Sequence, residues 1–198
     1  LVRNSLANNN WLIITNGGSF FANDDIEFAS RSNFLWIGGT DPDTGASSLL
    51  NLGGNWLIIG TGPSNTVTVS GGGIVTNGTV TLGGRYTGAS YGTLVITNGG
   101  MVFGPGNIGY DTDQAGNCLS NRVIITGTGS VWYGAGATFN VGRQQEPGTT
   151  GSWNSIIVEN SGLLTNVGTI RLGMRAGSVS HSNSIVVNGG GVLSASNI

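Results

Sequence analysis

The sequence contains no lysine, and its seven basic residues are all arginine. Charged residues make up only 8% of the 198 residues, and the formal net charge is −2. The chain therefore lacks the basic patch that nucleic-acid binding requires. Low charge also gives little electrostatic protection against self-association. No apolar run approaches the roughly 18 residues of a membrane-spanning helix, so we expect neither a nucleic-acid partner nor a membrane span.

Cysteine is almost absent as well. The single Cys118 excludes an intrachain disulfide and a cysteine-rich zinc site, and we expect it to be a small buried apolar residue. The chain begins at Leu1 with neither an initiator methionine nor a signal-peptide pattern. This beginning indicates a processed product or part of a larger chain.

Glycine, by contrast, is abundant, with 37 residues, and it recurs within an internal repeat. Four segments align directly: N65-T-V-T-V-S-G-G-G, N121-R-V-I-I-T-G-T-G, N154-S-I-I-V-E-N-S-G and N183-S-I-V-V-N-G-G-G. Two variants join them, N10-W-L-I-I-T-N-G-G and G92-T-L-V-I-T-N-G-G. Each segment ends in glycine at one register, at Gly18, Gly73, Gly100, Gly129, Gly162 and Gly191. A glycine that recurs at one register indicates a bend with positive φ or a close approach of two backbones.

Each unit reads as a strand, a glycine turn, a short strand, a bend, a second short strand and a polar loop. Examples of the last short strand are V80-T-L-G, F139-N-V-G, I170-R-L-G and L35-W-I-G. Units of this kind predict an all-β fold, a parallel β-helix (β-solenoid) that is right-handed by the crossover rule. The asparagine before the first strand predicts a stacked amide ladder. A β-sandwich is the alternative fold.

We predict one domain over residues 1–198 with about seven coils of about 27–33 residues, one of them short. The predicted coils are 10–46, 47–64, 65–91, 92–120, 121–153, 154–182 and 183–198, the last completed by residues 1–9 of the next subunit.

Units in the style of "NSIIVENSGLL…TIRLG" resemble the degenerate repeats of bacterial secreted β-helices, such as autotransporter passengers and adhesin-like surface proteins. The resemblance covers most of the chain. It implies a parallel β-helix and an extracellular or cell-surface location.

Residues for catalysis or metal binding are few. Asp24, Asp25 and Glu27 form the densest acidic group, but no lysine can serve as a base, so we expect no enzymatic activity. A polysaccharide-degrading β-helix enzyme is the least favoured reading. We expect no cofactor except weak Ca²⁺ candidates in two Asp- and Gly-containing loops. These candidates are Asp41, Asp43, Asp111 and Asp113, and ordinary turns are the alternative.

Two stripes of side chains are candidates for contacts along the solenoid. Residues at the starts of the loops predict a possible glycan-binding stripe: Arg85, Tyr86, Tyr110, Arg143 and Arg175. Outward positions of the first strands predict an apolar lateral stripe: Ile13, Val95, Ile124, Ile157 and Val186, with Thr68 among them.

Neither end of the chain resembles the polar cap that solenoids use to protect their open coils. Ile198 aligns with Ile170, and joining Ile198 to Leu1 gives a full coil in which Leu1 and Val2 take the places of Arg171 and Leu172. We therefore expect a homopolymer in which subunits stack head to tail into a fibre or surface layer. The predicted interface residues are Leu1, Val2, Asn4, Trp11, Ile13, Ile185, Val187, Leu193 and Ile198. An adhesin-like or glycan-binding stalk segment of a larger surface protein is the alternative.

Overall fold

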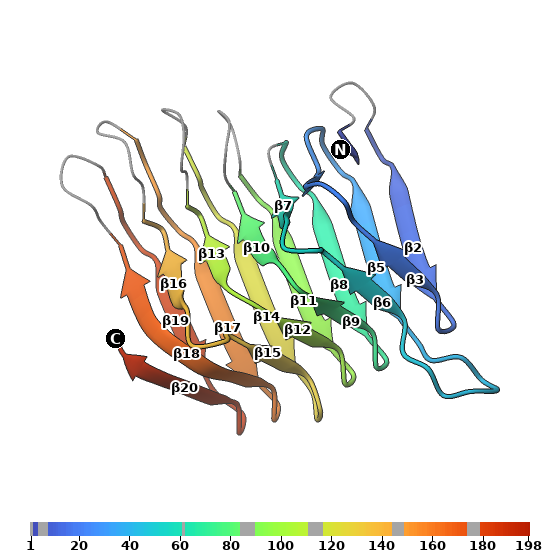
Figure 1. The fold of residues 1–198 in the computed structure, drawn as a ribbon. Coiled ribbons are helices and arrows are strands. Elements are labelled where there is room, and N and C mark those ends of the chain that lie inside the picture. Colours follow the sequence, from blue (N-terminus) through green and yellow to red (C-terminus); the bar gives the residue numbers. More distant parts are fainter. Residues whose placement is uncertain are drawn as a thin grey trace.

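The computed structural model describes residues 2–3 (backbone only), 8–60, 62–83, 90–110, 117–143, 149–173 and 179–198. All named strands pair in parallel, and successive strands wind along one axis, so the predicted β-solenoid is confirmed (Figure 1). The N- and C-terminal coils lie at opposite ends of the rod (Figure 1). In the described part of the chain there is no helix with the length and apolar character to cross a membrane.

The first strand of each coil belongs to a seven-stranded sheet, which we call the first column. Its strands are β2 (Trp11–Thr15), β5 (Phe34–Gly38), β8 (Thr66–Ser70), β11 (Thr93–Thr97), β14 (Arg122–Thr126), β17 (Ser155–Glu159) and β19 (Ser184–Val187). At the usual strand spacing of about 4.8 Å, seven strands span roughly 29 Å.

The remaining strands form a 13-stranded sheet that contains two columns. The second column holds β3 (Ser19–Phe21), β6 (Leu49–Asn51), β9 (Ile74–Thr76), β12 (Met101–Phe103) and β15 (Val131–Tyr133). The third column holds β1 (Val2–Arg3), β4 (Ile26–Glu27), β7 (Trp56–Ile59), β10 (Thr79–Leu82), β13 (Gly106–Ile108) and β16 (Thr138–Val141). In the last two coils β18 (Leu163–Leu172) and β20 (Val192–Asn197) run from the second column into the third.

Strict alternation fills the interior with rows of stacked apolar side chains. In β8, Val67 and Val69 are fully buried while Thr66, Thr68 and Ser70 are half-exposed. The largest buried side chains are Trp132 and Phe139, whose rings lie 5.0 Å apart, edge to face. Gly106 in the preceding coil makes room for both rings, because a Cβ there would lie 2.6 Å from each of them.

Tight turns join the first column to the second and explain the recurring glycines. Asn98 and Gly99 both have positive φ, the conformation of a two-residue turn that suits asparagine and glycine. The next residue, Gly100, has ordinary φ but lies against the preceding coil, where a Cβ would collide with the carbonyl oxygen of Val69. In this turn the recurring glycine, Gly100, makes the predicted close approach to the neighbouring backbone. The positive φ angles belong to the two residues before it.

The asparagines before the first-column strands form the predicted amide ladder. Asn121 donates to the Oδ1 of Asn154 through its backbone N–H and its Nδ2, both at 3.0 Å, and Asn154 donates to Asn183 in the same way. Asn10 and Asn33 repeat the pattern at the other end. These bonds satisfy backbone donors where the chain enters these coils.

The division of the first two coils differs from the prediction. L35-W-I-G was expected to be the last short strand of its unit, yet β5 lies in the first column, with Leu35 beside Leu12 and Val67. Residues 47–64 form no short coil, because β6 and β7 are the second and third strands of the coil that β5 begins. The first two coils therefore span residues 11–33 and 34–65, and the boundary between 46 and 47 is wrong.

Candidate assembly surfaces

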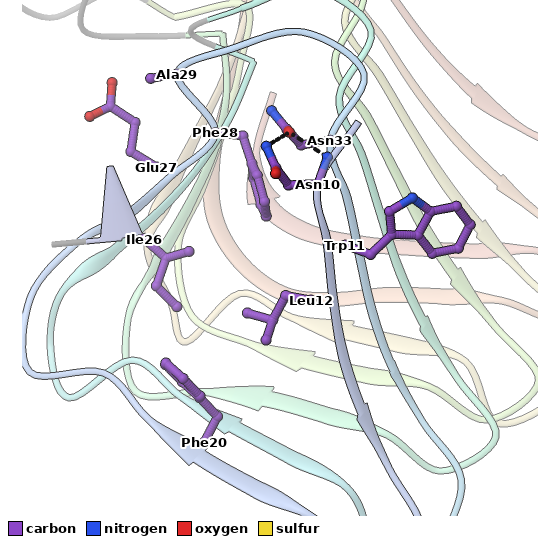
Figure 2. A pocket seen from close by; sticks show the side chains of 9 residues that line it. All are labelled: Asn10, Trp11, Leu12, Phe20, Ile26, Glu27, Phe28, Ala29 and Asn33. Atoms are coloured by element: carbon purple, nitrogen blue, oxygen red, sulfur yellow. Dashed lines mark hydrogen bonds between the residues drawn. The ribbon is translucent and has the colours of Figure 1, made fainter. Parts of the chain in front are cut away.

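The N-terminal end of the solenoid is an open apolar hollow. It has a volume of about 220 Å³. The inward side chains of the first coil, Leu12, Phe20, Ile26 and Phe28, converge on it, as Figure 2 shows. Leu12, Phe20 and Phe28 pack against the core but remain partly exposed. The hollow is thus lined by the side chains that form the hydrophobic core at this end of the solenoid.

The C-terminal end has the same character. Ile185, Leu193 and Ala195 pack against the core and are partly exposed. Val187 continues the inward row of Val158, which is fully buried, yet Val187 is 44% exposed. In the described part of the chain, partly buried residues that pack on the core occur only in the first and last coils. Both ends therefore present apolar surface that a further coil would bury.

Several predicted interface residues lie at these two ends. Ile185, Val187 and Leu193 are inward positions of the last coil, and Ile198 is 85% exposed beyond β20. Trp11 contacts Phe34, with ring centroids 5.0 Å apart, and its ring points away from the hollow (Figure 2). Leu1 and Asn4 lie outside the described residues.

The register of β1 differs from the predicted one. Val2 was expected to take the place of Leu172, but it pairs with Ile26, and Arg3 pairs with Glu27. In the third column Ile26 is equivalent to Ile170. β1 therefore lies two residues from the position that a direct continuation from Ile198 would give it.

The outward residues at the centre of the first-column strands stand in one row. The row consists of Ile13, Trp36, Thr68, Val95, Ile124, Ile157 and Val186. Ile13 is 49% exposed, and the side chains in the middle of the row are half-buried by their neighbours. Trp36 was missed because L35-W-I-G was assigned to another column. Its indole Nε1 donates to the Ser70 hydroxyl at 2.8 Å.

A second outward apolar row, in the second column, was not predicted. It consists of Leu49, Ile74, Met101, Val131, Leu163 and Val192. Phe103 and Tyr133 lie beside it on adjacent strands, with ring centroids 6.1 Å apart. The sequence pattern could have predicted this row, because each of these residues directly follows the glycine turn or its equivalent and directly precedes an inward residue.

The predicted glycan stripe is not assembled by the described residues. Tyr110 is only 9% exposed, which leaves little of its ring for contact with a sugar, and its assignment as a glycan contact stays a prediction. Arg143 is half-buried. Arg85, Tyr86 and Arg175 lie outside the described residues.

The Ca²⁺ candidates Asp41 and Asp43 lie in a loop that is closed by its own hydrogen bonds. The Asp41 carboxylate accepts from the backbone N–H groups of Thr44 at 2.7 Å and Asp43 at 2.9 Å. These two bonds, Thr44 first, hold the pKa of Asp41 below its ordinary value. An antiparallel bridge between Thr40 and Ser47 closes the loop, which is thus an ordinary turn in its geometry.

Clustered metal ligands are not found in the described ranges, where no group of three or more His, Cys, Asp or Glu residues could hold a metal ion. Asp111 and Asp113 lie outside those ranges.

The acidic group of the first coil also has structural contacts. Asp25 accepts from the backbone N–H of Trp56 in the next coil at 2.9 Å, and Asp24 accepts from the N–H of Asp25 at 2.8 Å. One Asp25 oxygen is thus already engaged in holding two coils in register.

The fold defines a class of protein, the parallel β-solenoids. Comparison of the chain with models of protein families, with curated proteins and with solved structures gave no match in any of the three.

Proposed function

We propose that this chain is a structural, non-enzymatic component of an extracellular fibre or surface layer, in which copies of the solenoid stack end to end. The observation that carries the proposal is the position of the partly buried core residues, which lie only in the first and last coils of the described chain. A second copy would bury them as the internal coils bury one another.

The two ends are compatible in direction and in side chains. A parallel solenoid has the same strand direction in every coil, so the free edge of β19 can pair with the free edge of β2 in the next copy, and β20 with β3. Such a contact places Ile185 and Val187 against Leu12 and Ile14. Because the two surfaces differ, the contact does not close on itself and generates a filament.

Two neighbouring valines of β19 provide a matched test. Val187 points inward at the open end and is 44% exposed, whereas Val186 points to the outer face and is 40% exposed. Val187→Glu places a charge in the stacking surface, so we expect it to abolish end-to-end association in sedimentation velocity and electron microscopy. Val186→Glu should leave filament length unchanged. Equal association of Val187→Glu and the unaltered chain would refute the proposal.

The outward rows supply a lateral contact in the same proposal. A strip about 29 Å long and one side chain wide is too small for a stable dimer of single copies, which needs about 800 Å² on each partner. Along a filament the same strip repeats, so many weak contacts act together. We expect Val186→Glu and Ile157→Lys to separate bundled filaments into single ones, as seen by electron microscopy.

The adhesin-like stalk is distinguished by the same experiments. Discrete rods of one copy at every concentration, in a chain with unaltered ends, would favour a stalk segment whose neighbouring coils belong to the same polypeptide. Filaments with a meridional repeat of about 4.8 Å along the fibre axis would support stacking of copies.

A further inference from the structure

Directly before each strand of the first column, the chain turns through one residue with positive φ. These residues are Asn9, Ser32, Ser64, Tyr91, Ser120, Trp153 and Ser182, and we call them the corner row. The backbone N–H of each of the first six donates to a carbonyl of the following coil, as Tyr91 does to Leu119 and Trp153 to His181, both at 2.9 Å. The corner row therefore runs along one edge of the rod, with one residue in each coil.

Two members of the corner row do not suit this backbone conformation. Asparagine adopts positive φ more readily than most residues, and serine has a small side chain, whereas a bulky residue with positive φ is an outlier. Tyr91 and Trp153 nevertheless have φ angles of 63° and 57°, and each side chain is 56% exposed. Their rings contribute little to the core. An exposed ring at a strained backbone position points to a ligand rather than to packing.

The spacing of the two rings fits a sugar chain. One coil, that of Ser120, lies between the coils of Tyr91 and Trp153. Adjacent coils are about 4.8 Å apart, which is close to the length of one pyranose unit in an extended polysaccharide. In a β-1,4-linked chain successive sugars are flipped, so every second sugar turns the same face to one side. The two rings are thus placed to stack on alternate sugars of a chain that runs along the rod.

Polar side chains lie beside the space between the two rings. Arg122 is the first residue of β14, two residues after Ser120, and its side chain is exposed. On the adjacent strands it lies between Thr93 and Ser155, which are half-exposed. A guanidinium binds a carboxylate through two parallel hydrogen bonds, and the two hydroxyls can each donate and accept. This group of side chains therefore favours a sugar that carries a carboxylate.

The size of the site favours a polysaccharide over a protein partner. A wholly buried aromatic side chain contributes about 150–250 Å², so two rings that are each 56% exposed offer on the order of 200 Å². A stable protein interface needs about 800 Å² on each partner. A small ligand needs only apolar ring faces and a few well-placed polar groups, which this site provides.

We infer that Tyr91, Trp153 and Arg122 form a binding site for an extended, β-linked polysaccharide that carries carboxylates. The two rings stack on sugars of the same orientation, and Arg122 binds the carboxylate of the sugar between them. The site lies along the side of the rod, so it does not depend on end-to-end stacking and goes beyond the structural role proposed above.

The first test titrates the chain with two hexasaccharides in isothermal titration calorimetry, one of β-1,4-linked mannuronate and one of β-1,4-linked mannose. The two glycans differ only in whether the last carbon of each sugar is a carboxylate or a primary alcohol. We expect the mannuronate to bind at least about tenfold more tightly, because a hydrogen bond to a charged group contributes that much. Arg122→Gln should remove this preference.

The second test removes the rings one at a time. Serine stands in the corner row in four other coils, so Tyr91→Ser and Trp153→Ser introduce a residue that this backbone already carries. We expect each variant to bind mannuronate about tenfold more weakly, with an unchanged urea midpoint. Tyr133→Ala is the matched control. Tyr133 is 40% exposed but lies in the second column, so its loss should leave binding unchanged.

A third variant tests the spacing. Ser120→Trp with Trp153→Ser keeps two aromatic residues in the corner row but places them in adjacent coils, where successive sugars present opposite faces. We expect it to bind as weakly as Trp153→Ser alone.

Four results would overturn the inference. They are no binding of either glycan by the unaltered chain, equal affinity for both glycans, full binding by the variant with adjacent rings, and unchanged glycan binding by Trp153→Ser. If Trp153→Ser leaves glycan binding unchanged but separates bundled filaments, the corner row is a contact between copies instead.

Discussion

Replacement of one asparagine of the amide ladder tests whether the ladder stabilises the solenoid. Asn121 is fully buried in a central coil. Its Oδ1 accepts from the backbone N–H of Gly92 at 2.9 Å, and its Nδ2 donates to Asn154 at 3.0 Å. Asn121→Ala removes both bonds but keeps the bond from the backbone N–H of residue 121 to Asn154.

The expected destabilisation has two parts. The lost side-chain hydrogen bond contributes about 1 kcal/mol net, and the Gly92 N–H that is left buried without its acceptor costs about 1–3 kcal/mol. Together they lower the free energy of unfolding by about 2–4 kcal/mol. The matched control is Asn10→Ala at the exposed end of the same ladder, where the bond from Nδ2 to Asn33 is lost at a site open to water, and we expect less than about 1 kcal/mol there.

Urea unfolding followed by circular dichroism and tryptophan fluorescence measures both variants. The two signals must change together for a free energy to be defined in a repeat protein. A shift of the midpoint at constant slope reports stability alone. If Asn121→Ala costs no more than Asn10→Ala, the ladder follows the fold without stabilising it, and the reasoning is refuted.

Three further predictions concern the interior and the Asp41 loop. Gly106→Ala places a Cβ against Trp132 and Phe139, so we expect a loss of about 1–3 kcal/mol in urea unfolding. Combined with Trp132→Leu, the loss should be smaller than the sum of the two single losses, and additive losses would contradict this packing. The pKa of Asp41 is lower in the folded chain than its ordinary value of 3.8, so its stabilising contribution is present above about pH 4 and is lost as the pH falls through the folded pKa. When the pH is lowered from about 5 to about 2, a range that spans the ordinary pKa of an aspartate, Asp41→Asn should therefore lose less stability than the unaltered chain. If the urea midpoints of the two chains fall equally across that range, Asp41 makes no such contribution. The Cys118 thiol is fully buried, so its reaction with a thiol reagent should be no faster than unfolding; rapid labelling of the folded chain would disagree with its burial.

The first and second columns could be predicted from the sequence because their physical requirements are local. A two-residue turn with positive φ needs asparagine or glycine, and the half-buried strands on either side need alternation. Both requirements recur at the same positions in each unit, so the turn before Gly100 and the alternation of β8 were visible without coordinates.

The third column could not be predicted in the same way. The letters N-W-L-I-I occur twice, at residues 10–14 and 55–59, yet the first copy lies in the first column and the second copy in the third. Local preference is the same in both, and only pairing with neighbouring coils distinguishes them. In the third column the outward positions are buried as well: Ile58 is 1% exposed and Thr81 1% exposed. In the third column, alternation of apolar and polar residues therefore does not distinguish the outward side chains from the inward ones.

The assembly surfaces were predicted in part, for a related reason. Inward residues of the last coil, such as Val187, follow from the repeat alone. The position of β1 on β4 does not, because a shift of two residues keeps the same side chains on the same face and leaves the sequence pattern unchanged.

The loop from Thr40 to Ser47 is an insertion already present in this chain. In the other coils only three or four residues connect the first column to the second, whereas ten separate Gly38 from Leu49. Despite the added residues, Leu49 pairs with Ser19 on one side and Ile74 on the other, as the uninterrupted coils do. The pairing of β6 with its neighbours is therefore independent of the length of the turn between β5 and β6. A foreign peptide of unrelated sequence, grafted between Asp43 and Gly45, would be displayed at a fixed point on the rod while the coils beneath it stay in place.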